Sequence, residues 1–311
     1  MGVGGPGVSQ YASYETSYEQ RTPYVTAAEY NNSPQSIDTM NLIAGGSAQA
    51  NQTALVETIG RASSWVDQFT CGAWGTLCAT QNTESARIWS GRDGLLKVHP
   101  RWWPILSVDS LSYSPVGAGF ANAASVTPAG NVWIEPQEFI VNPFASGNFS
   151  LSYWPGGVAP TREYYLTYVF TNGWPNTTLA ASVAAGATSI QPLNVTGLYP
   201  GTMLTLYDLP YDEAIQVSQS YVPGSAIVPF DIPLSFNHGI GATITNLPPA
   251  VKQATLLMTT AFIKLRGSGA LVVSDMGAQL HQQTGFSQQG GSDVAQAETL
   301  LMPFKMVYVG T

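Results

Sequence analysis

Hydrophobic positions recur at helical spacing in the first third of the chain. Between residues 47 and 69 they fall three or four residues apart, at Leu55, Ile59, Ala62, Trp65 or Val66, and Phe69. This spacing predicts a helix that ends before Cys71 and buries a single apolar stripe. Earlier in the chain, Thr26 and Glu29 have the spacing of a capping box, which predicts a short helix that ends near Pro34.

Two further helices are predicted near the end of the sequence. Pro249 begins an apolar run, and proline is tolerated in the first turn of a helix because the N–H it lacks would have no partner there. We expect this helix to end at Gly267. The segment 293–304 predicts a last helix that Pro303 breaks.

Between these helical regions, short runs of β-branched and aromatic residues are bounded by Gly, Pro or Asn, which is typical of strands. Residues 86–90 and 95–99 flank a glycine-rich turn and predict a hairpin. Residues 105–113 do not alternate strictly, which predicts a strand that is bulged or buried on both faces. Four later runs predict a small antiparallel sheet: 131–136, 138–143, 148–155 and 162–175.

The predicted fold class is α+β, a small helical bundle core with a strand hairpin plus inserted antiparallel β structure. Residues 176–246 are almost uncharged and turn-rich, which predicts a compact β module inserted into the chain. Residues 1–22 show no periodicity and predict a flexible arm. The expected domains are therefore a core of residues 23–113 and 247–311, a β extension of residues 114–175, and the module.

This chain contains unusually few charged residues. Asp, Glu, Lys and Arg make up 10% of its 311 residues, against roughly 25% in an average globular protein. We therefore expect faces that neighbouring subunits cover rather than water. The net charge of −8 argues against a large basic surface for nucleic acid or anionic membranes. No stretch has the pattern of a signal peptide or a membrane span, so we expect an intracellular protein that is soluble when made.

No motif in the sequence predicts a metal, cofactor or catalytic site. The three histidines, His99, His238 and His281, are far apart and lack ligand spacing. Cys71 and Cys78 have no zinc-binding partners nearby, and we expect two ordinary thiols, since a disulfide would need an oxidising compartment.

Two pairs of acids could in principle serve glycoside hydrolysis, namely Glu135 with Glu138 and Asp212 with Glu213. The first pair flanks Pro136 at a predicted strand end. The second lies in a turn, where acids usually interact with solvent. The expected catalytic, cofactor and metal residues are none, and we expect no enzyme.

The order of four segments along the chain can be compared with that of known families. TAAEY and then ALVETIGRASSWVDQFTCG form a helix pair, and RIWSGRDGLLKVHP with WWPILSVDSLSY forms a hairpin, an aromatic-proline block and a strand. The helix PPAVKQATLLMTTAFIKLRG follows, and AETLLMPFKM closes the series. This order resembles the head-to-tail connector, or adaptor, proteins of long-tailed bacteriophages. The resemblance covers about half of the chain, and residues 114–175 and 176–246 are additions to the pattern.

The resemblance implies a virion protein of the phage neck, made in the host bacterial cytoplasm. It implies a ring of about a dozen copies beneath the portal protein, followed by a stopper or tail-completion protein, with the capsid as a further candidate neighbour. Genomic DNA would pass through an acidic channel without specific binding, because a basic wall would trap phosphates. No membrane partner is implied.

The resemblance also implies where such a subunit would meet its neighbours. In connectors of this type the C-terminal segment tends to dock at the portal, which makes Phe304, Met306, Val307 and Tyr308 the candidate portal contacts. A final strand within the subunit is the alternative for these residues.

The aromatic block supplies the candidate contacts between subunits. Trp102 and Trp103 lie between Pro100 and Pro104 and point to opposite faces of an extended chain. We expect one of the two to pack on the helix that carries Trp65 and the other to meet a neighbouring subunit.

A β-rich carbohydrate-binding or adhesion protein is the alternative function. Eight tryptophans, 15 tyrosines and the uncharged β block motivate it, since aromatic rings combine apolar area with a polar edge. A connector should form a closed oligomer and co-purify with portal. A binding module should be monomeric or trimeric and retain an oligosaccharide.

Overall fold

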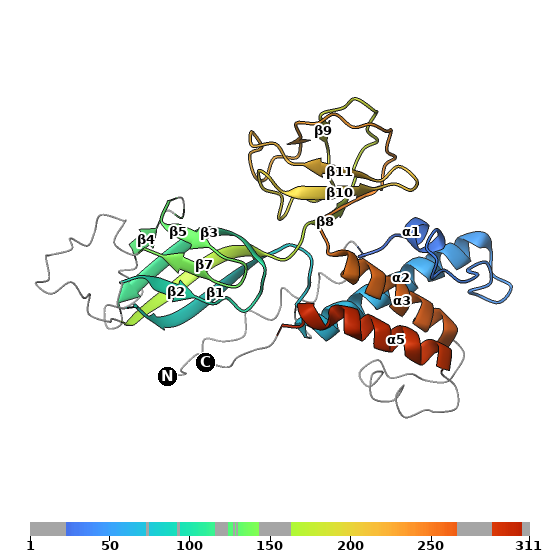
Figure 1. The fold of residues 1–311 in the computed structure, drawn as a ribbon, viewed down its shortest axis with the longest axis horizontal. Helices are drawn as coiled ribbons and strands as arrows, with labels where there is room; N and C mark the ends of the chain where they lie inside the picture. Colours follow the sequence, from blue (N-terminus) through green and yellow to red (C-terminus); the bar gives the residue numbers. More distant parts are fainter. Residues whose placement is uncertain are drawn as a thin grey trace, which may run out of the picture.

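Three structural units meet at a common junction in the computed structural model (Figure 1). A helical unit and a two-sheet unit lie end to end, and the module projects from the junction between them. The structure describes residues 23–72, 75–91, 94–115, 124–126, 128, 130–142, 163–265 and 288–306. The predicted α+β class is confirmed, with helices and antiparallel sheets in separate regions of the chain.

The helical unit consists of α1 (Ala27–Asn31), α2 (Ala48–Cys71), α3 (Pro249–Leu265), α5 (Gln288–Leu301) and the 3-10 turn η4 (Met302–Phe304). The capping box at the start of α1 is present, since the Thr26 hydroxyl accepts from the backbone N–H of Glu29 and the Glu29 carboxylate accepts from that of Thr26. The predicted stripe of α2 is buried from Leu55 to Val66. Pro303 ends α5 as predicted, and Gly267 lies outside the described residues.

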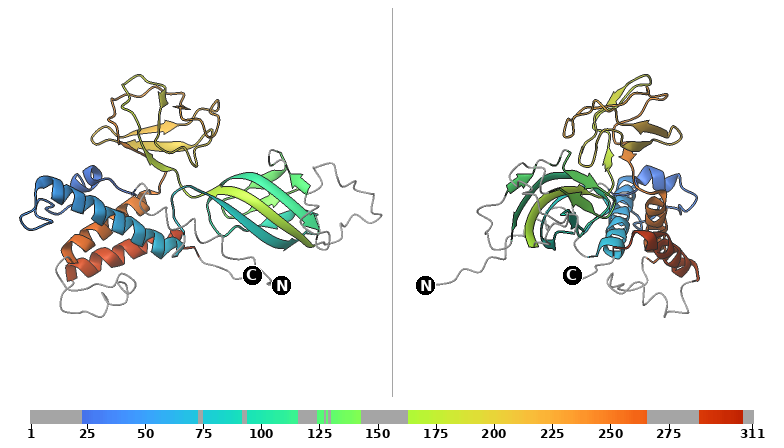
Figure 2. Two further views of the ribbon diagram at one scale, coloured as in Figure 1. Left: turned by 180° about the vertical axis from the view of Figure 1, so that it is seen from behind. Right: turned by 60° about the vertical axis from the view of Figure 1, so that its left-hand side comes forward.

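The two-sheet unit is built from two curved antiparallel sheets. The strands are β1 (Thr80–Trp89), β2 (Leu96–Val98), β3 (Ile105–Pro115), β4 (Ala124–Val126), β5 (Val132–Ile134), β6 (Phe139–Val141) and β7 (Glu163–Asn172). One sheet has the order β1-β7-β3-β4 and the other β2-β6-β5. In the right-hand view of Figure 2 the strands curve around a shared interior.

The predicted hairpin between residues 86–90 and 95–99 is wrong. β1 pairs with β7 along ten consecutive residue pairs, and β2 pairs with β6 instead. A ten-residue ladder offers far more hydrogen bonds than a hairpin with the three-residue β2 could form. The predicted irregularity of β3 is confirmed, because its register with β7 shifts at two places.

The structure also draws the boundary of the β region differently. The boundary expected after residue 113 falls inside β3, and strands from both sides of it share one sheet. The strands of the helical-core prediction and those of the predicted β extension therefore belong to one unit, which begins near Cys78 and ends near Pro175. The strand expected at 148–155 lies outside the described residues.

The module contains β8 (Asn176–Thr178), β9 (Ser189–Ile190), β10 (Met203–Tyr207), β11 (Glu213–Gln216), β12 (Val228–Pro229) and β13 (Thr243–Thr245). Its four-stranded sheet has the order β11-β10-β13-β8, and β9 pairs with β12. The entering strand β8 is hydrogen-bonded to the leaving strand β13. Because its two ends are adjacent, the module is an insertion between β7 and α3 that does not separate them.

Two cores hold most of this architecture together. One apolar cluster runs without interruption from the helices into the two-sheet unit and includes Val66, Leu77, Leu166 and Met258. The module has its own cluster, centred on residues such as Leu206 and Ile244. The helical and two-sheet units therefore share one core, whereas the module buries its own.

Candidate interaction site at the aromatic junction

The aromatic block predicted at residues 102–103 lies where the helical and two-sheet units meet. Trp102 is only 7% exposed and belongs to the shared core. Its indole lies directly against Gly75, because a Cβ built at Gly75 would be 2.3 Å from Trp102 Cζ3 and 2.4 Å from the Cβ of Cys71. Trp102 therefore packs inside the subunit at the end of α2 and is not a surface contact.

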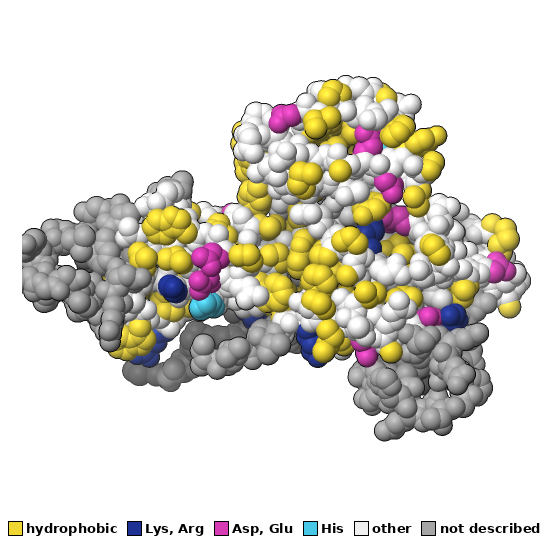
Figure 3. All heavy atoms as spheres, viewed as in Figure 1, with side chains coloured by type: hydrophobic (Ala, Val, Ile, Leu, Met, Phe, Trp, Pro, Cys, Tyr) yellow, Lys and Arg dark blue, Asp and Glu magenta, His cyan; other side chains and the backbone are white. Residues whose placement is uncertain are grey.

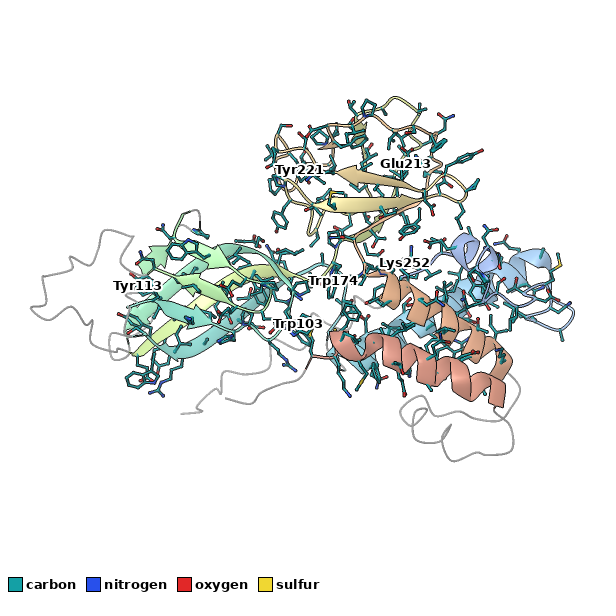
Figure 4. All side chains as sticks on the ribbon, in the orientation of Figure 1. Trp103, Tyr113, Trp174, Glu213, Tyr221 and Lys252 are labelled. Carbon is teal, nitrogen blue, oxygen red and sulfur yellow. The ribbon has the colours of Figure 1, made fainter. Side chains whose placement is uncertain are left out.

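Trp103 is the tryptophan of the pair that stays partly accessible. It packs against the edge of the same core with part of its ring exposed. Figure 4 labels Trp103 and Trp174 close to the junction of the two units. Of the two candidate subunit contacts, Trp103 is the one that a neighbouring protein could reach.

A half-buried carboxylate anchors the loop that carries these tryptophans. Glu84 Oε2 accepts hydrogen bonds from the backbone N–H of Arg101, at 3.1 Å, and from the Tyr168 hydroxyl, at 2.9 Å. Its other oxygen is buried without a hydrogen-bond partner among the described residues. Burial raises the pKa of Glu84, because it outweighs these hydrogen bonds and the nearby Arg101 charge. The Arg101 guanidinium in turn stacks over Trp102 at 4.9 Å.

The raised pKa of Glu84 predicts a pH-dependent contribution to stability. The unfolded state ionises this carboxyl near its ordinary pKa of 4.5, whereas the folded state holds the proton to higher pH. The free energy of unfolding should therefore be highest below the pKa of the unfolded state, and it should fall as the pH rises from that value through the higher pKa of the folded state. In Glu84→Gln no proton can be lost, so this fall should be absent. Urea unfolding of both proteins between acidic and neutral pH measures the difference, and parallel curves would contradict the prediction.

The C-terminal segment reaches the same junction. Phe304 packs edge-on against Trp174 with a ring separation of 5.8 Å, and Lys305 lies 5.1 Å over the Phe69 ring. The backbone N–H of Met306 donates to the carbonyl of Thr70 at 2.8 Å, and its side chain is buried in the shared core.

Of the four candidate portal contacts, Met306 thus packs within the subunit. Phe304 is half-buried, and Val307 and Tyr308 lie outside the described residues. Residues 302–306 form the turn η4 and its continuation and contain no strand, and the remainder of the strand considered as an alternative lies outside the described residues.

The residues weighed for catalysis are engaged in structural contacts or exposed. His99 pairs with Glu138 at 3.3 Å on the surface, and Cys71 and Cys78 are thiols rather than a disulfide. Within the described ranges, no cluster of three or more His, Cys, Asp or Glu side chains could hold a metal ion. Likewise, no described helix is long and apolar enough to span a membrane.

Buried His238 and half-buried Glu213 form a pair in the module that the sequence did not reveal. Glu213 accepts hydrogen bonds from the backbone N–H groups of Ser235 and Phe236, each at 2.8 Å, and lies 2.9 Å from His238 Nε2. Burial alone would raise the pKa of Glu213, but these three hydrogen bonds lower it below its ordinary value. Asp208 accepts from the N–H of Gly239 at 3.0 Å. The two carboxylates thus fix one loop of the module onto another.

A buried ion pair on the helices contacts the module. Lys252 on α3 bonds to Glu29 of α1, and its ammonium lies 3.4 Å from the ring centroid of Tyr207 on β10. Burial lowers the pKa of Lys252 more than Glu29 raises it. The helix α3 carries two lysines, Lys252 and Lys264, and nothing in the sequence marks Lys252 as the one that makes this contact.

Comparisons with known proteins identify no relative of this chain. No family model, curated protein or solved structure matches the chain.

Proposed function

We propose that this chain is a structural connector of a bacteriophage neck, which assembles as a ring beneath the portal and extends the DNA channel toward the tail. The observation that carries the proposal is the exposure of large apolar side chains on all three units, including Met40, Trp89, Trp133 and Ile232. Figure 3 shows hydrophobic side chains spread over the visible surface, with few charged ones among them. Surfaces of this kind are usually covered in an assembly.

The proposal gives the aromatic junction a role in attachment. Trp103 and Phe304 both pack on the edge of the shared core and remain partly accessible. They come from chain segments about two hundred residues apart. A partner that contacts both would therefore bind only when the helical and two-sheet units are packed together. We propose the portal as the partner at this junction, with a stopper or tail-completion protein at another face of the ring.

A carbohydrate-binding or adhesion protein is the second candidate. One observation favours it: the rings of Tyr211 and Phe236 contact each other, with their centroids 4.8 Å apart, although the two residues are 48% and 42% exposed. Exposed aromatic pairs can form platforms for sugar rings. Glycan binding by a monomer that Phe236→Ser abolishes would support this candidate over the connector.

Electron microscopy of the purified chain, alone and mixed with portal, tests the connector. We expect rings with a central channel of DNA width and attachment of these rings to portal. Truncation after Met306 should leave the subunit folded, because Met306 and its bond to Thr70 are retained, but should weaken attachment. Isolated particles under every condition would exclude the proposal. Full attachment of the truncated chain would exclude residues 307–311 from the portal contact and leave Phe304 as the C-terminal candidate.

A further inference from the structure

The module is joined to the rest of the chain through one pair of strands. Its entering strand β8 is paired with its leaving strand β13, and the backbone N–H of Asn246 donates to the carbonyl of Pro175 at 2.9 Å. Its apolar core is separate from the core that the other two units share. A domain attached in this way could rotate about its paired strands, because domains move relative to each other unless their contacts prevent it. The orientation of the module therefore depends on what it contacts in the two other units.

The loop 197–199 of the module packs closely against the two-sheet unit. Gly197 is buried, and a Cβ built there would lie 2.4 Å from the Cβ of Ala79 and 3.1 Å from Leu106 Cδ1. The next residue, Leu198, belongs to the core of the module. Because Gly197 has no side chain, the loop can pack directly against the residue that precedes β1.

A hydrogen-bond network continues this contact into the sheet. Ser107 on β3 donates to Asp109 Oδ1 at 2.7 Å, and the Ser107 oxygen also bonds to the hydroxyl of Tyr199. Since Ser107 gives its single proton to Asp109, Tyr199 is the donor to Ser107. Asp109 Oδ2 accepts from Gln81 on β1 at 2.8 Å and from Thr171 on β7 at 3.0 Å. The Tyr199 hydroxyl is thereby bonded to a network that spans three strands.

The second contact of the module is with the helical unit. The Lys252 ammonium, which Glu29 holds in place, lies 3.4 Å from the ring centroid of Tyr207 at the end of β10. Figure 4 labels Lys252 on α3, below the module in this view. The helical and two-sheet units lie on opposite sides of the module's paired strands (Figure 1). The module is therefore held from two directions.

We infer that the module is a rigid part of the subunit, held in one orientation by these two contacts together. Either contact alone leaves rotation about the line that joins it to the paired strands, whereas two contacts in different directions prevent this rotation. The inference concerns a single copy and does not depend on the proposed ring. In any assembly each copy would present the module at the same angle, which lowers the entropic cost of binding through it.

Distances between pairs of spin labels test this inference, because their distributions broaden when a domain moves. One label is attached at Ile227→Cys on the module. The other is attached at Val56→Cys on α2 or at Trp133→Cys on β5, and all three native side chains are exposed. Cys71→Ala/Cys78→Ala removes the native thiols, and dilution with unlabelled chains restricts the measurement to distances within one copy. We expect a single narrow distribution for each pair of labels.

Two variants remove one contact each. Ala79→Leu/Tyr199→Phe opens the contact with the two-sheet unit, because a leucine does not fit against Gly197 and the hydroxyl is lost. Tyr207→Leu removes the ring on which the ammonium lies and leaves the ion pair of the helices intact. Each variant should broaden both distributions about twofold or more. If the first variant does not fold, Tyr199→Phe alone tests the same contact.

Tyr221→Phe is the matched control, since it loses a hydroxyl hydrogen bond within the module, to the carbonyl of Ser225 at 3.1 Å. It should leave both distributions unchanged, and circular dichroism checks that every variant is folded. Broad distributions before any contact is removed would show that the module swings, and narrow ones in both variants would show that the paired strands alone fix it. Broadening in only one of the two variants would show that a single contact is sufficient. Each of these results would overturn the inference.

Discussion

Replacing Trp102 with alanine is expected to lower the free energy of unfolding by about 3–5 kcal/mol, the range for removal of a large aromatic side chain from a core. The indole is almost fully buried against Gly75 and Cys71, where the helical and two-sheet units share one core. Its loss leaves a cavity that the end of α2 and the anchored loop can fill only by moving. Equilibrium unfolding in urea measures the change.

Trp89→Ala is the matched control, because Trp89 is 63% exposed on β1. We expect this change to stay within about 0.5 kcal/mol. Gly75→Ala tests the same contact by adding an atom to it. The added Cβ would overlap the Trp102 ring, so this change should also destabilise the protein. Equal stability of Trp102→Ala and Trp89→Ala would show that the indole does not join the two units.

The helices could be predicted from the sequence because their signals are local. The capping box at Thr26, the apolar stripe of α2 and the break at Pro303 each depend on residues within a few positions of one another. The strand pairing could not be predicted in this way. β1 and β7 are separated by more than seventy residues. No residue near β1 indicates that it pairs with this distant strand instead of with β2, the next strand along the chain.

The same distinction explains what could be predicted of the candidate sites. Strand geometry indicated that Trp102 and Trp103 point to opposite faces, but which one is buried depends on Gly75 and α2, which approach from elsewhere in the fold. The sequence predicts that Asp212 and Glu213 lie in a turn and interact with solvent. Glu213 instead accepts two backbone hydrogen bonds from a loop more than twenty residues later, a contact that only the folded module creates.

Lys252→Met is expected to destabilise the protein by about 3–5 kcal/mol, the cost of leaving one member of a buried ion pair without the other. Methionine retains most of the apolar stem, but Glu29 would remain largely buried near the Tyr207 ring without its cation. Lys264→Met on the same helix is the matched control, because its pair with Asp293 is more exposed and such pairs contribute about 0–1 kcal/mol.

The double variant Glu29→Gln/Lys252→Met decides what the pair does. If the cost of the single change is the unpaired carboxylate, the double variant should recover most of the lost stability, since a neutral amide can still accept the hydrogen bond from the Thr26 N–H. The pair also joins α1 and α3 to β10, so both variants should increase hydrogen exchange where the module meets the helices. Full additivity of the two changes would mean that Glu29 and Lys252 act independently. The orientation of the module would then depend on its paired entry and exit strands, β8 and β13, rather than on this charge contact.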